Sequence, residues 1–214
     1  MEGRRDERLR LHALSEGIGD LARLAAWCDH VLDTGIRSLR LREPNWATEE
    51  YLRACERLRP RCEAYGALLL VTEHVECVLA GLADGLQVGS RTPSAANVRS
   101  VIGSQAWLGF SAHDPAQLAK AHAAGCDFAL LSPVWSTASK PDQAPLGTSL
   151  ASDWTKAAAL PVLWLGGVDD HAADAVRKLA PGDRPYGLAA ITAFAGGGAA
   201  STVARLRQIL GAPN

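Results

Sequence analysis

The sequence predicts an α/β protein that forms one domain, a TIM (β/α)8 barrel over residues 1–214. Short apolar runs alternate with amphipathic helical segments along the chain, and this alternation favours parallel strands joined by right-handed crossovers. Eight such units within 214 residues leave little room for insertions or a second domain. A six-stranded doubly wound sheet is the alternative, but no G-x-G-x-x-G follows the first expected strand.

We expect eight strands, each a short apolar run bounded by turn-forming or polar residues. In chain order they are Leu9–Leu14, Ser38–Arg42, Ala67–Thr72, Gly85–Gly89, Trp107–Ser111, Phe128–Val134, Val162–Gly166 and Gly187–Thr192. Helices are expected between the strands, for example over residues 20–35, 48–66 and 114–125. These segments open with Asp or Thr and close with Gly, as helix caps require.

The composition favours a small-molecule ligand. Lys and Arg total 22 against 23 Asp and Glu, for a formal net charge of -1, so the chain has no broad positive surface for nucleic acid and must bind any anion locally. Five cysteines without a C-x-x-C pair suggest reduced thiols in the cytosol. The charged N-terminal segment lacks the apolar core of a signal peptide, and no apolar run is long enough to cross a membrane. We therefore expect a cytoplasmic protein that binds a small molecule and neither nucleic acid nor membrane, and that can form a homo-oligomer.

The segment SPVWSTASKPDQAPLG, residues 132–147, follows the sixth expected strand and is rich in hydroxyl groups. In a TIM barrel the loops after the strands carry the chemistry. Thr137, Ser139 and Lys140 are candidates for binding phosphate, because hydroxyls donate hydrogen bonds and an ammonium supplies charge. The alternative is a solvated loop with a surface lysine.

The second expected strand ends in Arg40, Arg42 and Glu43. Residues two apart in a strand share one face, so both arginines point to the same side, where they can bind a phosphate or diphosphate. The alternative is that one of them pairs with Glu43 or with a helix carboxylate.

Polar residues also follow the third and fifth expected strands. The carboxylate of Glu73, next to Thr72, is of the type that Mg²⁺ prefers, although Glu73 could instead cap the next helix. Ser111 and His113 follow the fifth strand. His113 is the candidate catalytic residue, but a single histidine is more often structural.

Glycines follow the last two strands, with Gly166 and Gly167 after the seventh and AGGG after Ile191 and Thr192 of the eighth. Glycines let backbone N–H groups approach an anion closely, and many TIM barrels bind phosphate at this place. A Gly-Gly pair can also mark nothing more than a tight turn.

Seven segments together resemble the thiamine phosphate synthases and the related thiazole tautomerases, which are TIM barrels of about this length. The segments are LRLRE, LADGLQVGS, GFSAHD, SPVWSTASKP, APLG, LGGV and ITAF. The synthases carry Gln-Leu-Arg-x-Lys at the first of these and Gly-Pro-x-x-x-Thr-x-Thr-Lys at the fourth. The resemblance implies an enzyme that uses Mg²⁺ to join a hydroxymethylpyrimidine diphosphate to a thiazole phosphate, releasing pyrophosphate in a step of thiamine biosynthesis.

The resemblance also implies roles for the candidate residues. Arg40, Arg42, Thr72, Ser111 and Lys140 would bind the substrate diphosphate; Thr137, Ser139, Gly166, Gly167, Ile191 and Thr192 would bind the thiazole phosphate; and Glu73 would bind the metal.

The chain departs from the family pattern at the diphosphate and metal sites. Arg40 replaces the motif's Gln, Pro44 replaces its Lys, and Thr92 replaces the second metal-binding Asp. Pro133 stands where the tautomerases carry their catalytic histidine. Two further hypotheses follow: a tautomerase-like isomerase that uses His113 or Glu73 as base without a metal, and a barrel that binds a phosphorylated ligand without turnover.

Overall fold

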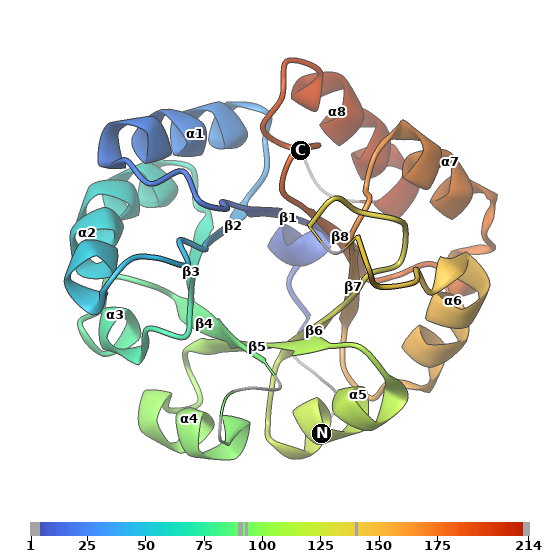
Figure 1. Ribbon diagram of the computed structural model, residues 1–214, viewed down its shortest axis with the longest axis horizontal. Coiled ribbons are helices and arrows are strands. Elements are labelled where there is room, and N and C mark those ends of the chain that lie inside the picture. Colours follow the sequence, from blue (N-terminus) through green and yellow to red (C-terminus); the bar gives the residue numbers. More distant parts are fainter. Residues whose placement is uncertain (1–4, 90–91, 93, 140, 212–214) are drawn as a thin grey trace.

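The strands close into a parallel barrel surrounded by helices (Figure 1). The computed structural model describes residues 5–89, 92, 94–139 and 141–211. Each strand pairs in parallel with the next, and the last pairs with the first, with Leu11 opposite Leu188 and Ala13 opposite Ala190. The predicted TIM barrel is therefore confirmed.

All eight predicted strands are present. Their bounds are β1 Leu11–Leu14, β2 Ser38–Leu41, β3 Leu68–Thr72, β4 Gly85–Val88, β5 Trp107–Ala112, β6 Phe128–Leu131, β7 Val162–Leu165 and β8 Gly187–Ala190. Most are one to three residues shorter than expected. The first loses its start because a 3-10 helix, η1 (Glu7–Arg10), precedes it.

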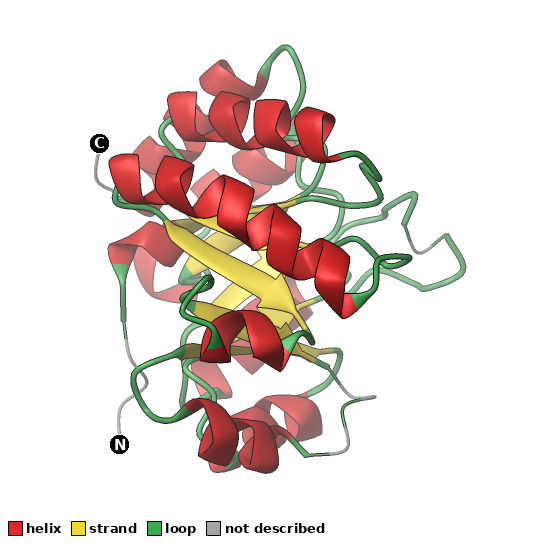
Figure 2. Ribbon diagram, turned by 90° about the vertical axis from the view of Figure 1, so that its left-hand side faces the viewer, coloured by secondary structure: helices red, strands yellow, loops and turns green. Residues whose placement is uncertain are grey.

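The helices alternate with the strands and lie outside them. Their bounds are α1 Leu21–Asp33, α2 Thr48–Ala64, α3 Val75–Leu79, α4 Ala95–Ile102, α5 Pro115–Ala123, α6 Gly147–Ala157, α7 Asp170–Lys178 and α8 Ala199–Leu210, with a 3-10 helix, η2 (Pro181–Asp183), before β8. Side chains of Asp20, Ser94, Asp114 and Asp169 accept backbone N–H bonds at helix starts, which satisfies donors that a helix start leaves free. Figure 2 shows the long loops on the side to which the strand arrows point.

The apolar side chains form two cores because each strand has two buried faces. Leu39 and Leu41 belong to the larger core, which includes helix residues such as Leu24 and Leu58. The inward-facing side chains form the smaller core, which includes Leu70 and Phe128. A filled interior is typical of this fold, which places ligands at the carboxyl ends of the strands.

All five cysteines are buried free thiols, as the odd number without a C-x-x-C pair predicts. Among the described helices, none has both the length and the apolar character needed to span a membrane.

Candidate functional site

A cavity of about 390 Å³ opens at the carboxyl end of the barrel, and every one of the eight strands or the loop after it contributes to its wall. A volume of this size suits a small ligand. Residues predicted from separate parts of the sequence meet here. They are Arg40, Arg42, Thr72, Glu73, Ser111, His113, Thr137, Ser139, Gly166 and Ile191.

Three predicted site residues are not placed in this wall. Lys140 lies outside the described residues. Gly167 and Thr192 are described but are not part of the cavity lining. The carbonyl of Thr192 accepts the N–H groups of Ala195 and Gly196, so it forms the turn after β8.

Gly167 packs against the loop that follows β6. A Cβ atom at this position would lie 2.3 Å from the carbonyl oxygen of Ser136 and 2.8 Å from the Cβ of Trp135. Its φ of 66° also lies in the left-handed region, which favours glycine. This glycine allows the loops after β6 and β7 to approach each other.

Arg42 forms an ion pair with Glu16 at the rim of the cavity. The other carboxylate oxygen of Glu16 accepts a long hydrogen bond of 3.5 Å from the Ser139 hydroxyl. Sequence reasoning missed Glu16, although it follows the first strand directly and the strand-end rule applied to the other strands would have found it.

Glu43 pairs with neither Arg40 nor Arg42. Its carboxylate accepts hydrogen bonds from the Ser15 hydroxyl and the Gly19 N–H, both at 2.9 Å. Its own N–H donates to the hydroxyl of Tyr51 at 2.8 Å. Glu43 therefore holds the loop after β1 in place, and the predicted alternative of an arginine paired with Glu43 is wrong.

Arg40 lies deeper than Arg42 and is 5% exposed. Its side chain makes no hydrogen bond or ion pair with any described residue, and its Nε is fully buried without a partner. Burial, followed by repulsion from Arg42, lowers the pKa of Arg40 to about 9. The side chain is thus still cationic at neutral pH.

Gln87 and Ser111 provide polar groups near the base of the cavity. The Gln87 amide donates to the Ser111 hydroxyl at 3.1 Å, and its carbonyl oxygen is buried without a partner. The carbonyl oxygen lies over Gly109, where a Cβ atom would come within 2.0 Å of it. The sequence pattern placed Gln87 at a strand end without assigning it a role.

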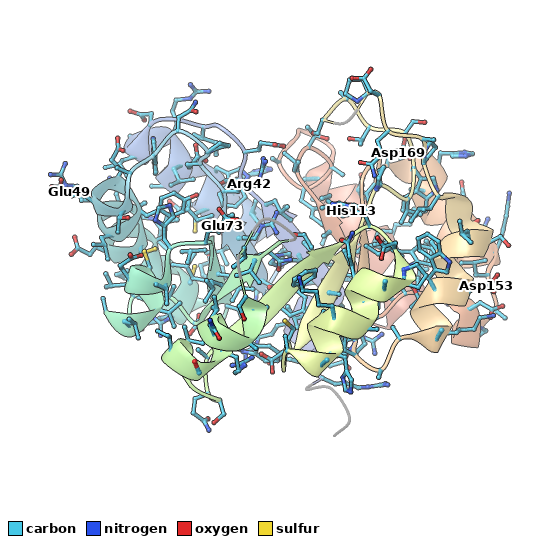
Figure 3. The ribbon with its side chains drawn as sticks, turned by 60° about the horizontal axis from the view of Figure 1, so that its bottom comes forward. Arg42, Glu49, Glu73, His113, Asp153 and Asp169 are labelled. Carbon is cyan, nitrogen blue, oxygen red and sulfur yellow. The ribbon has the colours of Figure 1, made fainter. Side chains whose placement is uncertain are left out.

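Glu73 stands at the rim with the only positive φ of a non-glycine residue in the described chain, 63°. Its N–H donates to the backbone carbonyl of Gln87 at 3.1 Å, which ties the end of β3 to β4. The expected alternative for Glu73, capping the next helix, does not occur, because α3 has no side-chain cap. Figure 3 labels Arg42 and Glu73, which follow the neighbouring strands β2 and β3, and His113, which follows β5.

The oxygen groups near Glu73 do not form a complete metal site. No group of three His, Cys, Asp or Glu side chains suited to a metal occurs in the described residues. The Thr72 hydroxyl donates to the Leu41 carbonyl at 3.1 Å. Because Mg²⁺ in proteins often has one or two carboxylates plus substrate phosphates as ligands, this donor set fits a metal that binds together with a phosphorylated substrate.

His113 is fixed by a bond to the loop after β6. Its Nδ1 lies 2.6 Å from the carbonyl oxygen of Ser132. A carbonyl only accepts, so Nδ1 donates this bond, which fixes the orientation of the ring.

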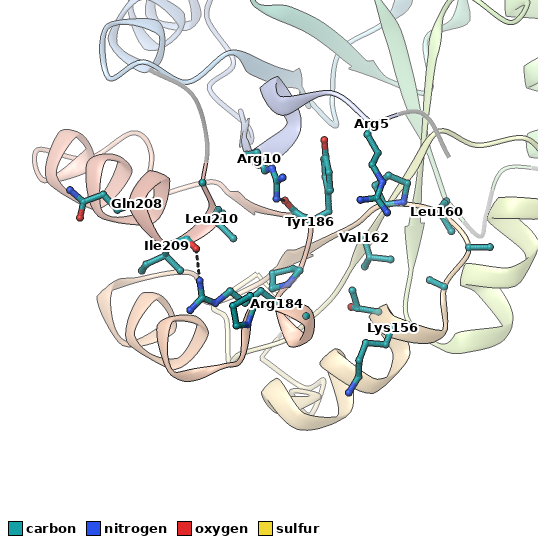
Figure 4. Close-up of a pocket in the computed structure, with 18 residues that line it drawn as sticks. Arg5, Arg10, Lys156, Leu160, Val162, Arg184, Tyr186, Gln208, Ile209 and Leu210 are labelled. Atoms are coloured by element: carbon teal, nitrogen blue, oxygen red, sulfur yellow. Dashed lines mark hydrogen bonds between the residues drawn. The ribbon is translucent and has the colours of Figure 1, made fainter. Parts of the chain in front are cut away.

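A larger cavity, of about 780 Å³, lies at the opposite end of the barrel (Figure 4). Three of its four described basic side chains form hydrogen bonds or ion pairs within the protein. Arg10 contacts Glu7 and the Tyr186 carbonyl, and Arg184 donates to the carbonyls of Leu179, Ile209 and Arg177. In TIM barrels, residues at the amino-terminal end of the strands contribute to stability, whereas the chemistry takes place at the carboxyl end.

The family model described as thiamine monophosphate synthase matches residues 13–182. The chain belongs to this family. Members among the curated proteins include the thiamine-phosphate synthase of Prochlorococcus marinus (strain MIT 9303), 35% identical over 147 residues, which are 69% of this chain and 42% of that protein. The thiamine-phosphate synthase of Laribacter hongkongensis (strain HLHK9) is 36% identical over 143 residues, 66% of this chain and 67% of that protein.

A solved structure similar to this family member is the thiamine phosphate pyrophosphorylase from Pyrococcus furiosus, with a TM-score of 0.80, 23% identity and coverage of 96% of both chains. At 23% identity, the similarity to this structure shows that the two chains share a fold.

The structure places two of the residues that depart from the family pattern away from the cavity wall. Pro44 is exposed after β2. The Thr92 hydroxyl accepts the Gly89 N–H at 3.2 Å, and the Thr92 N–H donates to the Gly89 carbonyl at 3.0 Å. Thr92 therefore closes a turn after β4. Pro133 lines the cavity, in the loop where tautomerases carry their histidine.

Proposed function

We propose that this chain joins a hydroxymethylpyrimidine diphosphate to a thiazole phosphate and releases pyrophosphate, as the thiamine phosphate synthases do. Its membership of the family supports the proposal. The observation that carries it is the cavity at the carboxyl end, which collects cationic, hydroxyl and carboxylate groups from separate strands.

In the proposed complex the diphosphate lies against Arg40, Arg42, Thr72 and Ser111, with Lys140 from the loop after β6. The thiazole phosphate lies against the opposite wall, formed by the loops after β6, β7 and β8. The residues proposed for this second group are Thr137, Ser139, Gly166 and Ile191 in the wall, with Gly167 and Thr192 next to them in the sequence. Charge-assisted hydrogen bonds from these groups would hold both substrates in register.

The chemistry requires no protein nucleophile. The bond between the pyrimidine methylene carbon and the diphosphate oxygen breaks, pyrophosphate leaves with the electron pair, and the thiazole nitrogen forms the new bond to that carbon. Arg42 would stabilise the negative charge on the leaving group. To do so it would exchange its ion pair with Glu16 for contacts with the substrate.

Mg²⁺ belongs to this proposal as a cation that binds with the diphosphate. When bound, it neutralises the developing charge on the leaving group. Glu73 would supply the protein oxygen that holds it, since Thr92 offers no carboxylate. The remaining ligands would be phosphate oxygens and water.

A tautomerase-like isomerisation of a thiazole phosphate is the second candidate. The observation that favours it is the fixed orientation of the His113 ring, whose Nδ1 donates to the Ser132 carbonyl and whose Nε2 would act as the base. Such a reaction would proceed without a metal.

The test is an incubation of the purified chain with both synthase substrates, with and without Mg²⁺, followed by detection of thiamine phosphate and pyrophosphate. The synthase proposal expects both products in equal amounts and none after addition of chelator. Isomerised thiazole phosphate formed in the presence of chelator would support the second candidate. Substrate binding without any turnover would overturn both and leave a binding protein.

A further inference from the structure

A tyrosine behind the cavity wall contacts the two segments that carry Arg42 and Glu73. Arg42 follows β2 and Glu73 follows β3, and both line the carboxyl-end cavity. Tyr51 lies in the first turn of α2, is buried, and is not among the lining residues. A residue outside the cavity therefore contacts the backbone next to the proposed cation and the turn that carries the proposed metal ligand.

The hydroxyl of Tyr51 holds the backbone next to Arg42. The Glu43 N–H donates to this hydroxyl at 2.8 Å, and the Arg42 N–H donates to the Ser15 hydroxyl at 3.0 Å. Ser15 in turn donates to the Glu43 carboxylate at 2.9 Å. Of these bonds, the one to Tyr51 ties the segment to a helix. Ser15, Glu43 and Tyr51 are all buried, so the loss of a partner leaves a polar group unsatisfied.

The ring of Tyr51 supports the turn that contains Glu73. The His74 ring stacks on it, with the centroids 3.8 Å apart and the planes 29° apart. The Nδ1 of His74 also lies 3.2 Å from the Thr48 hydroxyl oxygen. Thr48 and Tyr51 both belong to the first turn of α2. Because His74 directly follows Glu73, these contacts hold one side of the turn against the helix.

The turn at Glu73 has an unfavourable backbone conformation. The His74 N–H donates to the Thr72 carbonyl at 2.8 Å, and the residue between them, Glu73, has a φ of 63°. A three-residue turn with a positive φ at its centre is rare and strained, and a residue other than glycine keeps such a conformation only where its surroundings enforce it. The Glu73 N–H is bonded to β4, so the contacts of His74 fix the other side of the turn.

We propose that Tyr51 is a positioning residue that sets the distance between the Arg42 guanidinium and the Glu73 carboxylate. The inference rests on the proposed function, in which these two groups bind the diphosphate and its Mg²⁺. The hydroxyl determines where Arg42 lies, and the ring, through His74, determines where Glu73 lies. A diphosphate that bridges Arg42 and Mg²⁺ needs both groups at a fixed separation, because a displacement of about 1 Å can remove much of an enzyme's activity.

Calorimetric titration with inorganic pyrophosphate, with and without Mg²⁺, tests the two contacts separately. Tyr51→Phe removes the hydroxyl and keeps the ring. Pyrophosphate binding without Mg²⁺ should therefore weaken about 3- to 10-fold, and the Mg²⁺ concentration for half-maximal enhancement of binding should stay that of the parent chain. Tyr65→Phe is the matched control, since it removes a hydroxyl that donates to Asp33 at the other end of α2. The control should change neither measurement.

His74→Leu tests the stacked ring. It removes the aromatic contact and keeps the Tyr51 hydroxyl, so the Mg²⁺ concentration for half-maximal enhancement should rise about 3- to 10-fold. Pyrophosphate binding without Mg²⁺ should be unchanged. His74→Phe can still stack on Tyr51, so it should restore the Mg²⁺ requirement of the parent chain. Tyr51→Leu, which lacks both the hydroxyl and the ring, should show both changes.

The outcomes distinguish this inference from the proposed function. A parent chain that binds no pyrophosphate overturns the proposed function. A parent chain that binds pyrophosphate more tightly with Mg²⁺, while Tyr51→Phe and His74→Leu match it in both measurements, overturns the inference alone. Variants in which both measurements always change together do the same. If Tyr51→Phe and His74→Leu both fail to fold, the tyrosine serves the fold and the inference is wrong.

Discussion

Arg40 lies in β2 and Arg42 directly follows that strand, yet of the two only Arg42 forms an ion pair with a described carboxylate. The difference comes from depth in the barrel, because Glu16 at the rim can reach the second arginine. A strand pattern places both side chains on one face but does not show how deeply each is buried. The structure therefore supplies the difference in burial and pairing between the two side chains.

Glu73 is the residue that we expect to determine how strongly the activity depends on Mg²⁺. Replacing it with Gln removes the charge and keeps the shape, so Glu73→Gln should raise the Mg²⁺ concentration for half-maximal activity by about tenfold. The measurement is a Mg²⁺ titration of pyrophosphate release. Glu49→Gln is the control, since Glu49 is exposed on α2 and pairs with Arg53. A Glu73→Gln curve that overlays the parent curve would exclude Glu73 as the ligand.

His12 gives the fold a defined sensitivity to acid. Burial, with a contribution from Arg40, lowers the pKa of His12 from 6.5 to about 3, and its Nδ1 contacts the Ser38 hydroxyl at 2.8 Å. Between these two pH values the unfolded chain binds a proton that the folded chain does not. Stability should thus fall as the pH drops below 6.5, with a contribution from this group of up to about 1.4 kcal/mol per pH unit.

Denaturant unfolding of the parent chain and of His12→Gln at several pH values measures this contribution. The variant should lose less stability than the parent chain between pH 6.5 and pH 3 and should show the same pH dependence above 6.5. Parallel curves across the acid range would contradict the assignment.

At the scale of elements, the loops after β6 and β7 form one unit. The N–H of Val134 donates to the Leu165 carbonyl at 3.0 Å, and that of Trp135 donates to the Gly166 carbonyl at 3.1 Å. The sequence predicted a sixth strand that continues to Val134, but the ladder ends at Leu131. The chain turns there toward β7, and an apolar run alone does not reveal such a change of direction.

Gly167→Val tests this unit. The new side chain would meet the Ser136 carbonyl and adopt a left-handed φ, so the variant should lose about 1–3 kcal/mol of unfolding free energy. It should also bind phosphorylated ligands more weakly, because Thr137 and Ser139 lie in the displaced loop. Gly197→Ala is the control, since a Cβ atom there meets open space. Equal melting temperatures for Gly167→Val and the parent chain would show that the loops pack independently.

At the scale of the whole molecule, barrel closure explains how much of the site the sequence could predict. The periodicity of apolar residues was sufficient to predict the eight strands. Position at the end of a strand was sufficient to predict most of the residues that line the cavity. The pair of Arg42 with Glu16 and the isolation of Arg40 depend on the pairing of β1 with β2 and on side-chain length. These features depend on tertiary structure, and neither the alternation of strands and helices nor the spacing of motifs predicts them. Gly167 was predicted for its flexibility near an anion, whereas the structure shows that it accommodates a neighbouring loop.

The two cavities at opposite ends of the barrel make the location of the chemistry the central claim. A crystal structure of the chain grown with pyrophosphate and Mg²⁺ tests it most directly. We predict pyrophosphate in the carboxyl-end cavity, with Arg42 turned from Glu16 to within hydrogen-bond distance of a phosphate oxygen. Pyrophosphate beside Arg10 and Tyr186 in the opposite cavity, or no bound pyrophosphate at a saturating concentration, would contradict the account.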